Sequence, residues 1–166
     1  REVSAVFQNP GNQFIALNVL DEVFKSLELW NPRENGEALR SRALEILDRY
    51  GLKKYRRYSP YMLSQGQQRR LAVLSVLAGG QRLLLLDEPT AAMGIHESHR
   101  TMGLLKELRD RGMTQLIISH NLHQVFDLAD YIYVMRSGRI MAGAATQSTS
   151  PDELRSFILH REEEAL

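Results

Sequence analysis

The chain has 166 residues, of which 43% are hydrophobic and 25% charged, so it can form one domain with a buried core and is neither disordered nor fibrous. Its 21 basic and 20 acidic side chains leave a formal net charge of +1, and we expect no nucleic-acid partner from it. The absence of cysteine excludes disulfide bonds, thiolate metal sites and a cysteine nucleophile. The longest apolar stretch, residues 71–78, is far shorter than the roughly 20 residues that a membrane-spanning helix needs.

The amino-terminal part of the sequence predicts two helices that pack together. Apolar residues recur at helical spacing over residues 18–30 and again over 37–50, and Gly51 suits the end of the second helix. Ahead of these helices, the chain starts at Arg1 and runs at once into segment 6–10, which is typical of the interior of a domain. We therefore expect a further segment upstream of Arg1.

Segment 53–58 alternates basic and aromatic residues. This pattern is compatible with a patch that binds nucleic acid. Because positive and negative charges balance over the chain as a whole, we favour the simpler interpretation of a solvated loop.

A third helix is predicted over residues 64–78, and its first turn is the most informative part of the chain. Ser64 and Gln67 have the spacing of a capping box, which accounts for both as helix-stabilising residues. Gly66 favours a second interpretation, because glycine costs helix stability yet lets a ligand approach the backbone closely. A helix start with a hydroxyl, a glycine and unpaired N–H groups is suited to bind an anion such as phosphate.

The pattern then changes to short apolar runs, over residues 83–86, 116–118 and 131–135, which are typical of strands buried on both faces of a parallel sheet. Helices predicted over residues 96–111 and 122–129 separate these runs. The alternation of strands and helices predicts a right-handed parallel α/β arrangement.

The carboxyl-terminal part of the sequence predicts a hairpin and a last helix. Residues 136–138 turn the third strand into a further strand, which begins at residue 139. Ser150 is expected to cap the last helix, with Pro151 in its first position and Glu153 completing a capping box.

Asp87 and Glu88 directly follow the first predicted strand of the parallel sheet. They should therefore lie at the carboxyl end of that strand, where open α/β sheets bind their ligands. Asp87 suits Mg²⁺, which is held by one or two carboxylates together with substrate phosphates, and Glu88 suits a general base that activates water. The alternative is that these acids only cap a loop at the end of the strand.

His120 ends the next predicted strand and would lie beside Glu88 if the two strands are neighbours. It could then contact a γ-phosphate, although a purely structural histidine remains an alternative. A second alternative is zinc binding, because His96 and His99 share the spacing of His120 and His123.

Taken together and in this order, these residues resemble the ATPase domain of ATP-binding-cassette (ABC) transporters over essentially the whole chain. Four motifs carry the resemblance: Gln8 matches the Q-loop glutamine, residues 63–67 the signature motif, residues 83–88 the Walker B motif with its catalytic glutamate, and His120 the switch histidine. The sequences of residues 7–13 and 129–140 look most like those of the energy-coupling-factor and cobalt-type branch of this family.

The resemblance implies a P-loop NTPase-like α/β fold with a parallel sheet core and an α-helical subdomain, its amino-terminal part missing. Residues 1–81 would hold the Q-loop and the helical signature subdomain, and residues 82–166 half of the catalytic core. The implied function is ATP hydrolysis that powers a membrane transporter for a micronutrient or metal ion. The implied partners are a second ATPase domain, packed head to tail, and a transmembrane subunit at the cytoplasmic face of the membrane.

The resemblance also assigns roles to individual residues, with ATP and Mg²⁺ as cofactors. Gln8 and Asp87 would contact Mg²⁺, Glu88 would activate the attacking water and His120 would hold the γ-phosphate. The signature residues would bind the ATP of the opposite subunit; they are Ser64, Gln65, Gly66 and Gln67.

Three departures from the family pattern stand out. None of the 11 glycines precedes a lysine, so the chain has no G-x-x-x-x-G-K-[ST] phosphate loop, and we expect it to be inactive by itself. Gln65 replaces the first of the two usual glycines of the signature. Gly94, in segment 91–94, replaces the usual aspartate of the D-loop, which puts communication between two ATP sites in doubt.

Two rival functions remain open at this stage. The chain could be a non-catalytic module of the same fold that regulates a partner ATPase through its signature face. It could also belong to a soluble ABC ATPase that acts on DNA or ribosomes.

Overall fold

The computed structural model describes residues 3–78, 81–91 and 93–159, and the chain divides into two compact units, Arg1–Ile118 and Ser119–Leu166. The predicted division at residue 81 separates functional halves of a larger domain, and it stays a prediction.

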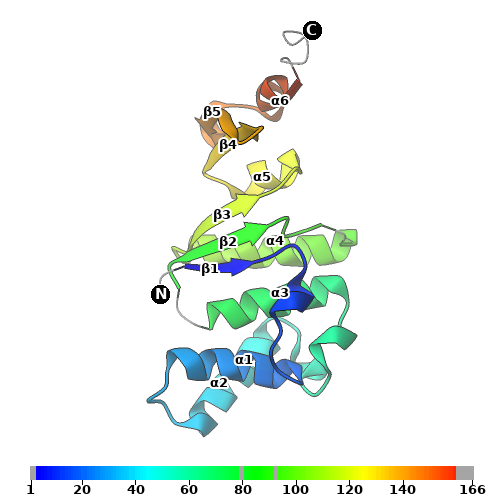
Figure 1. Ribbon diagram of the computed structural model, residues 1–166, viewed down its shortest axis with the longest axis vertical. Coiled ribbons are helices and arrows are strands. Elements are labelled where there is room, and N and C mark those ends of the chain that lie inside the picture. Colours follow the sequence, from blue (N-terminus) through cyan, green and yellow to red (C-terminus); the bar gives the residue numbers. More distant parts are fainter. Residues whose placement is uncertain (1–2, 79–80, 92, 160–166) are drawn as a thin grey trace. The chain divides into compact units, whose positions relative to one another are not determined.

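The centre of the first unit is a parallel sheet in the order β1 (Val3–Val6), β2 (Leu83–Asp87) and β3 (Thr114–Ile118). Val6 pairs with Leu86, and Asp87 pairs with Ile118, so the carboxyl ends of all three strands meet at one edge (Figure 1). The prediction that β2 and β3 are parallel neighbours is confirmed. Strand β1 was not predicted, because its four residues include a serine and an alanine and are too short to show a pattern.

The described residues of the first unit form four α-helices at the predicted places: α1 (Val19–Trp30), α2 (Gly36–Arg49), α3 (Gln65–Leu77) and α4 (Ile95–Asp110). The side chains of Asn18 and Asn35 accept backbone N–H groups at the starts of α1 and α2. Helix α1 packs against both α2 and α3, as Figure 1 shows. The predicted pairing of the first two helices is therefore confirmed.

Helix α3 lies at the centre of the first unit, in contact with α1, α4 and β1. Eight of its residues are buried, and they include Arg69 and Arg70 as well as the apolar run from Leu71 to Leu74. Because the helix is covered on several sides, its sequence shows no single apolar face. Two arginines buried within a core helix need specific partners, and these partners define the site described below.

Segment 53–58 supports the start of α1. It contains a short 3₁₀ helix, Lys53–Tyr55, and two further such helices, Pro10–Gln13 and Pro60–Met62, lie elsewhere in the first unit. The carbonyls of Arg56 and Tyr58 accept the first backbone N–H groups of α1, at 3.0 Å each. The segment therefore has a structural role that its alternating composition did not indicate.

The second unit contains α5 (Leu122–Leu128), β4 (Tyr131–Arg136), β5 (Arg139–Ala145) and α6 (Pro151–Leu159), with a 3₁₀ helix at Thr146–Ser148. The prediction that residues 131–135 join the parallel sheet is wrong for the described residues, because β4 pairs with β5 in an antiparallel two-stranded sheet. Ile132 and Val134 are buried against Leu154 of α6, whereas Tyr131 and Tyr133 are exposed. Buried and exposed residues therefore alternate along β4. The sequence does not show this alternation, because the exposed positions carry tyrosine, which also counts as apolar.

The predicted hairpin and the last helix are present. Ser137 and Gly138 have φ angles of 48° and 75°, the left-handed conformation that a tight two-residue hairpin turn requires. The hydroxyl of Ser150 accepts the backbone N–H of Glu153 at 3.2 Å, as expected for the cap of α6. None of the helices in the described part of the chain has the length and apolar character needed to cross a membrane.

Candidate functional site

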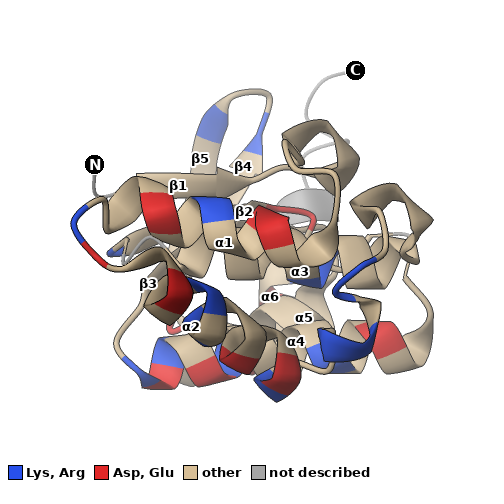
Figure 2. Ribbon diagram, turned by 90° about the horizontal axis from the view of Figure 1, so that it is seen from below, with Lys and Arg blue, Asp and Glu red and all other residues tan. Residues whose placement is uncertain are grey.

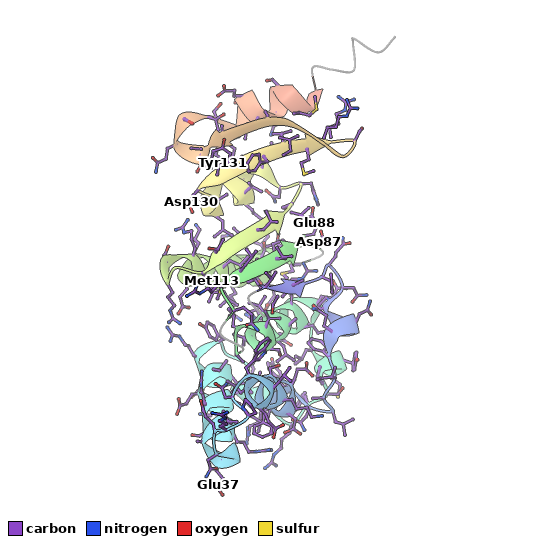
Figure 3. The ribbon with its side chains drawn as sticks, turned by 60° about the vertical axis from the view of Figure 1, so that its left-hand side comes forward. Glu37, Asp87, Glu88, Met113, Asp130 and Tyr131 are labelled. Atoms are coloured by element: carbon purple, nitrogen blue, oxygen red, sulfur yellow. The ribbon has the colours of Figure 1, made fainter. Side chains whose placement is uncertain are left out.

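The two acids of the candidate site lie at the carboxyl end of β2, next to the ends of β1 and β3 (Figure 3). Asp87 is the last residue of the strand and is half-buried. Glu88 turns out of the sheet with a φ of 46°, and its backbone N–H donates to the carbonyl of Ile118 at 2.9 Å. A non-glycine residue in this conformation costs about 1–2 kcal/mol, and such strain is found preferentially at functional sites.

Arg69 of α3 connects the elements of the site, and the sequence did not predict it as a site residue. Its buried guanidinium donates to the backbone carbonyls of Gln8 and Glu88, and to that of Asp87 at 3.4 Å. Burial lowers the pKa of Arg69, and the negative charges of Asp87 and Glu88 act against that shift. One cation therefore connects the loop after β1, the end of β2 and the helix that begins at Ser64.

Gln8 lies in the loop that follows β1, and its side chain is exposed. The neighbouring Gln13 holds the loop in place: its amide donates to the carbonyl of Ala5 at 2.8 Å, and its oxygen accepts the N–H of Phe7 at 3.2 Å. With the carbonyl of Gln8 bound to Arg69, the loop is fixed at both ends. The backbone carbonyls of Gln8, Asp87 and Glu88 thus share one hydrogen-bond donor, the guanidinium of Arg69.

The predicted capping box is present at the start of α3. The hydroxyl of Ser64 accepts the N–H of Gln67 at 3.3 Å, while the side-chain oxygen of Gln67 accepts the N–H of Ser64 at 3.0 Å. The amide nitrogen of Gln67 donates to the hydroxyl of Tyr55 at 3.1 Å. Ser64 and Gln65 are exposed, and the first N–H groups of a helix have no partner within it. The helix start therefore keeps the polarity that attracts anions.

Gly66 has a different environment from the predicted one. It is buried, and a Cβ atom added to it would lie 2.8 Å from the Cβ of Glu97 in α4. Glu97 in turn forms an ion pair of 3.3 Å with the buried Arg70. The side chain of Glu97, rather than a ligand, therefore occupies the space that glycine leaves free. This contact fixes α4 against the start of α3.

We expect Gly66→Ala to lower the free energy of unfolding by about 1–2 kcal/mol, because the overpacking against Glu97 exceeds the gain in helix propensity. Gly103 provides a matched control, since it lies within α4 with no atom inside 4 Å of an added Cβ. Gly103→Ala should stabilise the protein by about 1 kcal/mol. Urea denaturation of both variants checks this, and equal effects would contradict the proposed contact.

His120 lies at the start of the second unit, two residues after the end of β3. It is exposed and precedes α5, whose cap is Asn121. The zinc alternative, which involved His96, His99, His120 and His123, fails, because the described residues contain no group of three or more His, Cys, Asp or Glu side chains suited to a metal ion. Of the predicted D-loop, Ala92 lies outside the described residues, and Gly94 is the residue that precedes α4.

Solved structures with this fold are ATP-binding cassettes. CbiO1 of Clostridium perfringens, part of the ABC transporter complex CbiONQ, matches with a TM-score of 0.78 and 28% identity over 98% of this chain and 65% of that one. A dimeric ATP-binding cassette in a post-hydrolysis state, bound to ADP and phosphate, matches with a TM-score of 0.77 and 28% identity over 89% of this chain and 64% of that one. The fold is therefore that of an ABC ATPase domain, as predicted.

Sequence comparison gives the family. The family model described as ABC transporter matches residues 1–91, and the chain belongs to this family. EcfA of Methanocaldococcus jannaschii, an energy-coupling factor transporter ATP-binding protein, is 37% identical over 142 residues, which are 85% of this chain and 50% of EcfA. EcfA1 of Clostridium novyi is 37% identical over 140 residues, 82% of this chain and 48% of the relative. The predicted energy-coupling-factor and cobalt-type branch is confirmed, and the chain spans from about a quarter to just over half of the length of its curated relatives.

Proposed function

We propose that the chain is part of an ATPase subunit that hydrolyses ATP to drive a membrane transporter. One observation carries this proposal: the guanidinium of Arg69 joins the backbones of Gln8, Asp87 and Glu88 to the helix that begins at Ser64. The side chains that would act on one ATP, and the helix that would bind the ATP of the opposite subunit, thus share one anchor, the guanidinium of Arg69. A movement of α3 would then be transmitted through Arg69 to Asp87 and Glu88.

Within this proposal, Glu88 is the general base that takes a proton from the attacking water, and His120 holds the γ-phosphate. Asp87 and Gln8 offer carboxylate and amide oxygens, the donors that Mg²⁺ prefers, at the same edge of the sheet. When bound there, Mg²⁺ would neutralise negative charge on the phosphates. The left-handed backbone of Glu88 ends the extended strand at this residue, and such strained conformations occur preferentially at functional sites.

The signature residues serve a second ATPase domain in our proposal. Ser64, Gln65 and Gln67 would bind the ATP of the opposite subunit in a head-to-tail dimer, homomeric or heteromeric, and Gly66, which packs against Glu97, would contribute through its backbone alone. The first N–H groups of α3 and the partial positive charge of the helix start suit a phosphate. The dimeric state of a cassette with the same fold, bound to ADP and phosphate, supports this arrangement.

The phosphate loop must come from a segment that these 166 residues do not contain. Strand β3 has one neighbour among the described strands, β2, and its Leu116 and Ile118 are 56% and 62% exposed. Apolar residues on a strand with an unpaired edge favour the addition of another strand. We propose that the strand leading into the phosphate loop pairs here, which would place the loop at the same edge as Asp87 and Glu88.

A transmembrane subunit is the proposed partner, with the ATPase bound peripherally at the cytoplasmic face of the membrane. Several large apolar side chains are exposed around the loop after β1 and the turn before α3: Phe7, Ile15, Leu17, Tyr61 and Met62. The rings of Phe14 and Tyr61 contact edge to face at 6.1 Å, so the segment before α1 lies against the turn before α3. Uptake of a micronutrient or metal ion is proposed from the energy-coupling-factor and CbiO relatives.

The head-to-tail arrangement is tested at Ser64 in the full-length protein. We expect Ser64→Arg to reduce ATP hydrolysis to background while the affinity of the monomer for ATP stays unchanged, because the arginine blocks only the partner's nucleotide. Ser64→Asp keeps an acceptor for the N–H of Gln67 and should also abolish hydrolysis, since its carboxylate repels phosphate. Ser41→Arg, on the exposed face of α2, is the control and should be fully active. Loss of ATP affinity in the monomer would refute the trans role.

A further inference from the structure

Segment 53–58 contacts the start of α3 as well as that of α1. The hydroxyl of Tyr55 accepts a hydrogen bond from the side-chain nitrogen of Gln67 at 3.1 Å. Tyr55 lies between α2 and α3 and is half-buried, and Gln67 is in the first turn of α3. The alternating basic and aromatic residues of the segment therefore include one side chain that is bound directly to the signature residues.

The amide of Gln67 connects Tyr55 to Ser64. Its nitrogen donates to the hydroxyl of Tyr55, and its oxygen accepts the backbone N–H of Ser64 at 3.0 Å. Because one planar amide uses its donor on one side and its acceptor on the other, these two hydrogen bonds give the side chain a single orientation. The nitrogen carries a second N–H, which has no partner among the described residues and is available to a ligand.

Tyr55 is itself held by neighbouring residues. It ends the 3₁₀ helix Lys53–Tyr55, and its backbone N–H donates to the carbonyl of the fully buried Leu52 at 2.9 Å. Its ring contacts the ring of Tyr58 edge to face, with 5.7 Å between the ring centres. The carbonyl of Tyr58 in turn accepts the backbone N–H of Val19, the first residue of α1. The hydroxyl of Tyr55 is therefore a fixed point against which Gln67 is oriented.

Positive charge lies beside this hydroxyl. The ammonium of Lys54 is 4.9 Å from the centre of the Tyr55 ring. A hydrogen bond from Lys54 lowers the pKa of Tyr55, and the hydrogen bond from Gln67 acts in the same direction. Charges of both signs occur along α2 (Figure 2), whereas residues 53–57 carry four basic side chains and no acidic one. This local excess of positive charge favours a phosphate near the start of α3.

We propose that Tyr55 is a positioning residue of the signature: through the amide of Gln67, it holds the first turn of α3 in the orientation that binds the ATP of the partner subunit. This inference rests on the proposed function, in which the start of α3 binds that ATP. Tyr55 acts without touching the nucleotide, because it fixes Gln67, and the capping box links Gln67 to Ser64. Without the hydroxyl, the association of the two subunits has to order the side chain of Gln67, which weakens binding.

The test is Tyr55→Phe in the full-length protein that also carries Glu88→Gln, a parent that binds ATP and hydrolyses it slowly in our proposal. Phenylalanine keeps the ring and its contact with Tyr58 and removes only the hydroxyl. Sedimentation velocity with ATP and Mg²⁺ should show that the association of two ATPase domains is weakened by at least about threefold, because one hydrogen bond is lost. The affinity of the monomer for ATP should be unchanged, and the melting temperature should stay within about 3 °C of that of the parent.

Tyr58→Phe is the matched control, since it removes the same atom from an exposed tyrosine whose hydroxyl has no hydrogen-bond partner among the described residues. It should associate like the parent. The inference is overturned if Tyr55→Phe associates like the parent, if Tyr58→Phe weakens association equally, or if Tyr55→Phe also lowers the affinity of the monomer for ATP, which would indicate a general structural loss. If the parent itself does not associate when ATP is added, the proposed function fails, and this inference fails with it.

Discussion

In the full-length protein, Glu88→Gln should retain ATP binding and lower the rate of hydrolysis by at least about 10²-fold, the size of a general-base contribution. The amide occupies the same volume and keeps the left-handed backbone at residue 88, so the geometry around Arg69 is preserved. Only the ability to accept a proton from water is lost. Steady-state phosphate release at saturating ATP, together with nucleotide binding measured separately, checks the expectation.

A matched substitution keeps this result interpretable. Glu45→Gln makes the same chemical change on an exposed position of α2 and should leave hydrolysis unaltered. If Glu88→Gln hydrolyses ATP at the normal rate, Glu88 is not the base. If it loses ATP binding as well, its role is in holding the nucleotide.

The second large effect is expected at Arg69. Arg69→Met should lower the free energy of unfolding by about 3 kcal/mol, because it leaves the carbonyls of Gln8, Asp87 and Glu88 with fewer partners in a buried region. Methionine fills most of the volume of the arginine stem, so the loss reports mainly on hydrogen bonding. Denaturant titration followed by circular dichroism measures it.

Arg57→Met is the control for Arg69→Met, since Arg57 is exposed and the substitution should change stability by less than about 0.5 kcal/mol. Arg69→Lys keeps the charge but not the fork, and should fall between the two because one ammonium group cannot reach all three carbonyls with the same geometry. A loss below about 1 kcal/mol for Arg69→Met would show that the guanidinium does not anchor the site.

Local signals predicted the helices well. Asn18 and Ser64 cap helices whose apolar residues recur at the right spacing, and these interactions lie within one turn of the chain. Strand β4 was assigned to the wrong sheet because pairing partners are not encoded in a short apolar run, and Tyr131 and Tyr133 are apolar enough to hide the alternation. The prediction of a strand at residues 131–135 was correct, and only its pairing partner was wrong.

The candidate site shows the same division between local and long-range information. Asp87 and Glu88 could be placed from sequence, because the end of a buried strand is a local feature. Arg69 could not, because its partners are backbone carbonyls as far as 61 residues away along the chain, and any residue type supplies a carbonyl. Gly66 was read as an opening for a ligand, whereas the side chain of Glu97 occupies the adjacent space. The sequence showed that a glycine in the first turn of a helix is unusual, but it did not show that α4 contacts this glycine.

The most direct test of the proposed function is a crystal structure of the full-length Glu88→Gln variant with ATP and Mg²⁺. We predict that Gln8, residue 88 and His120 of one subunit face the γ-phosphate, and that the partner subunit's Ser64 lies against the same phosphate from the other side. A γ-phosphate that His120 does not reach, or a dimer in which the start of α3 points away from the nucleotide, would contradict the proposal.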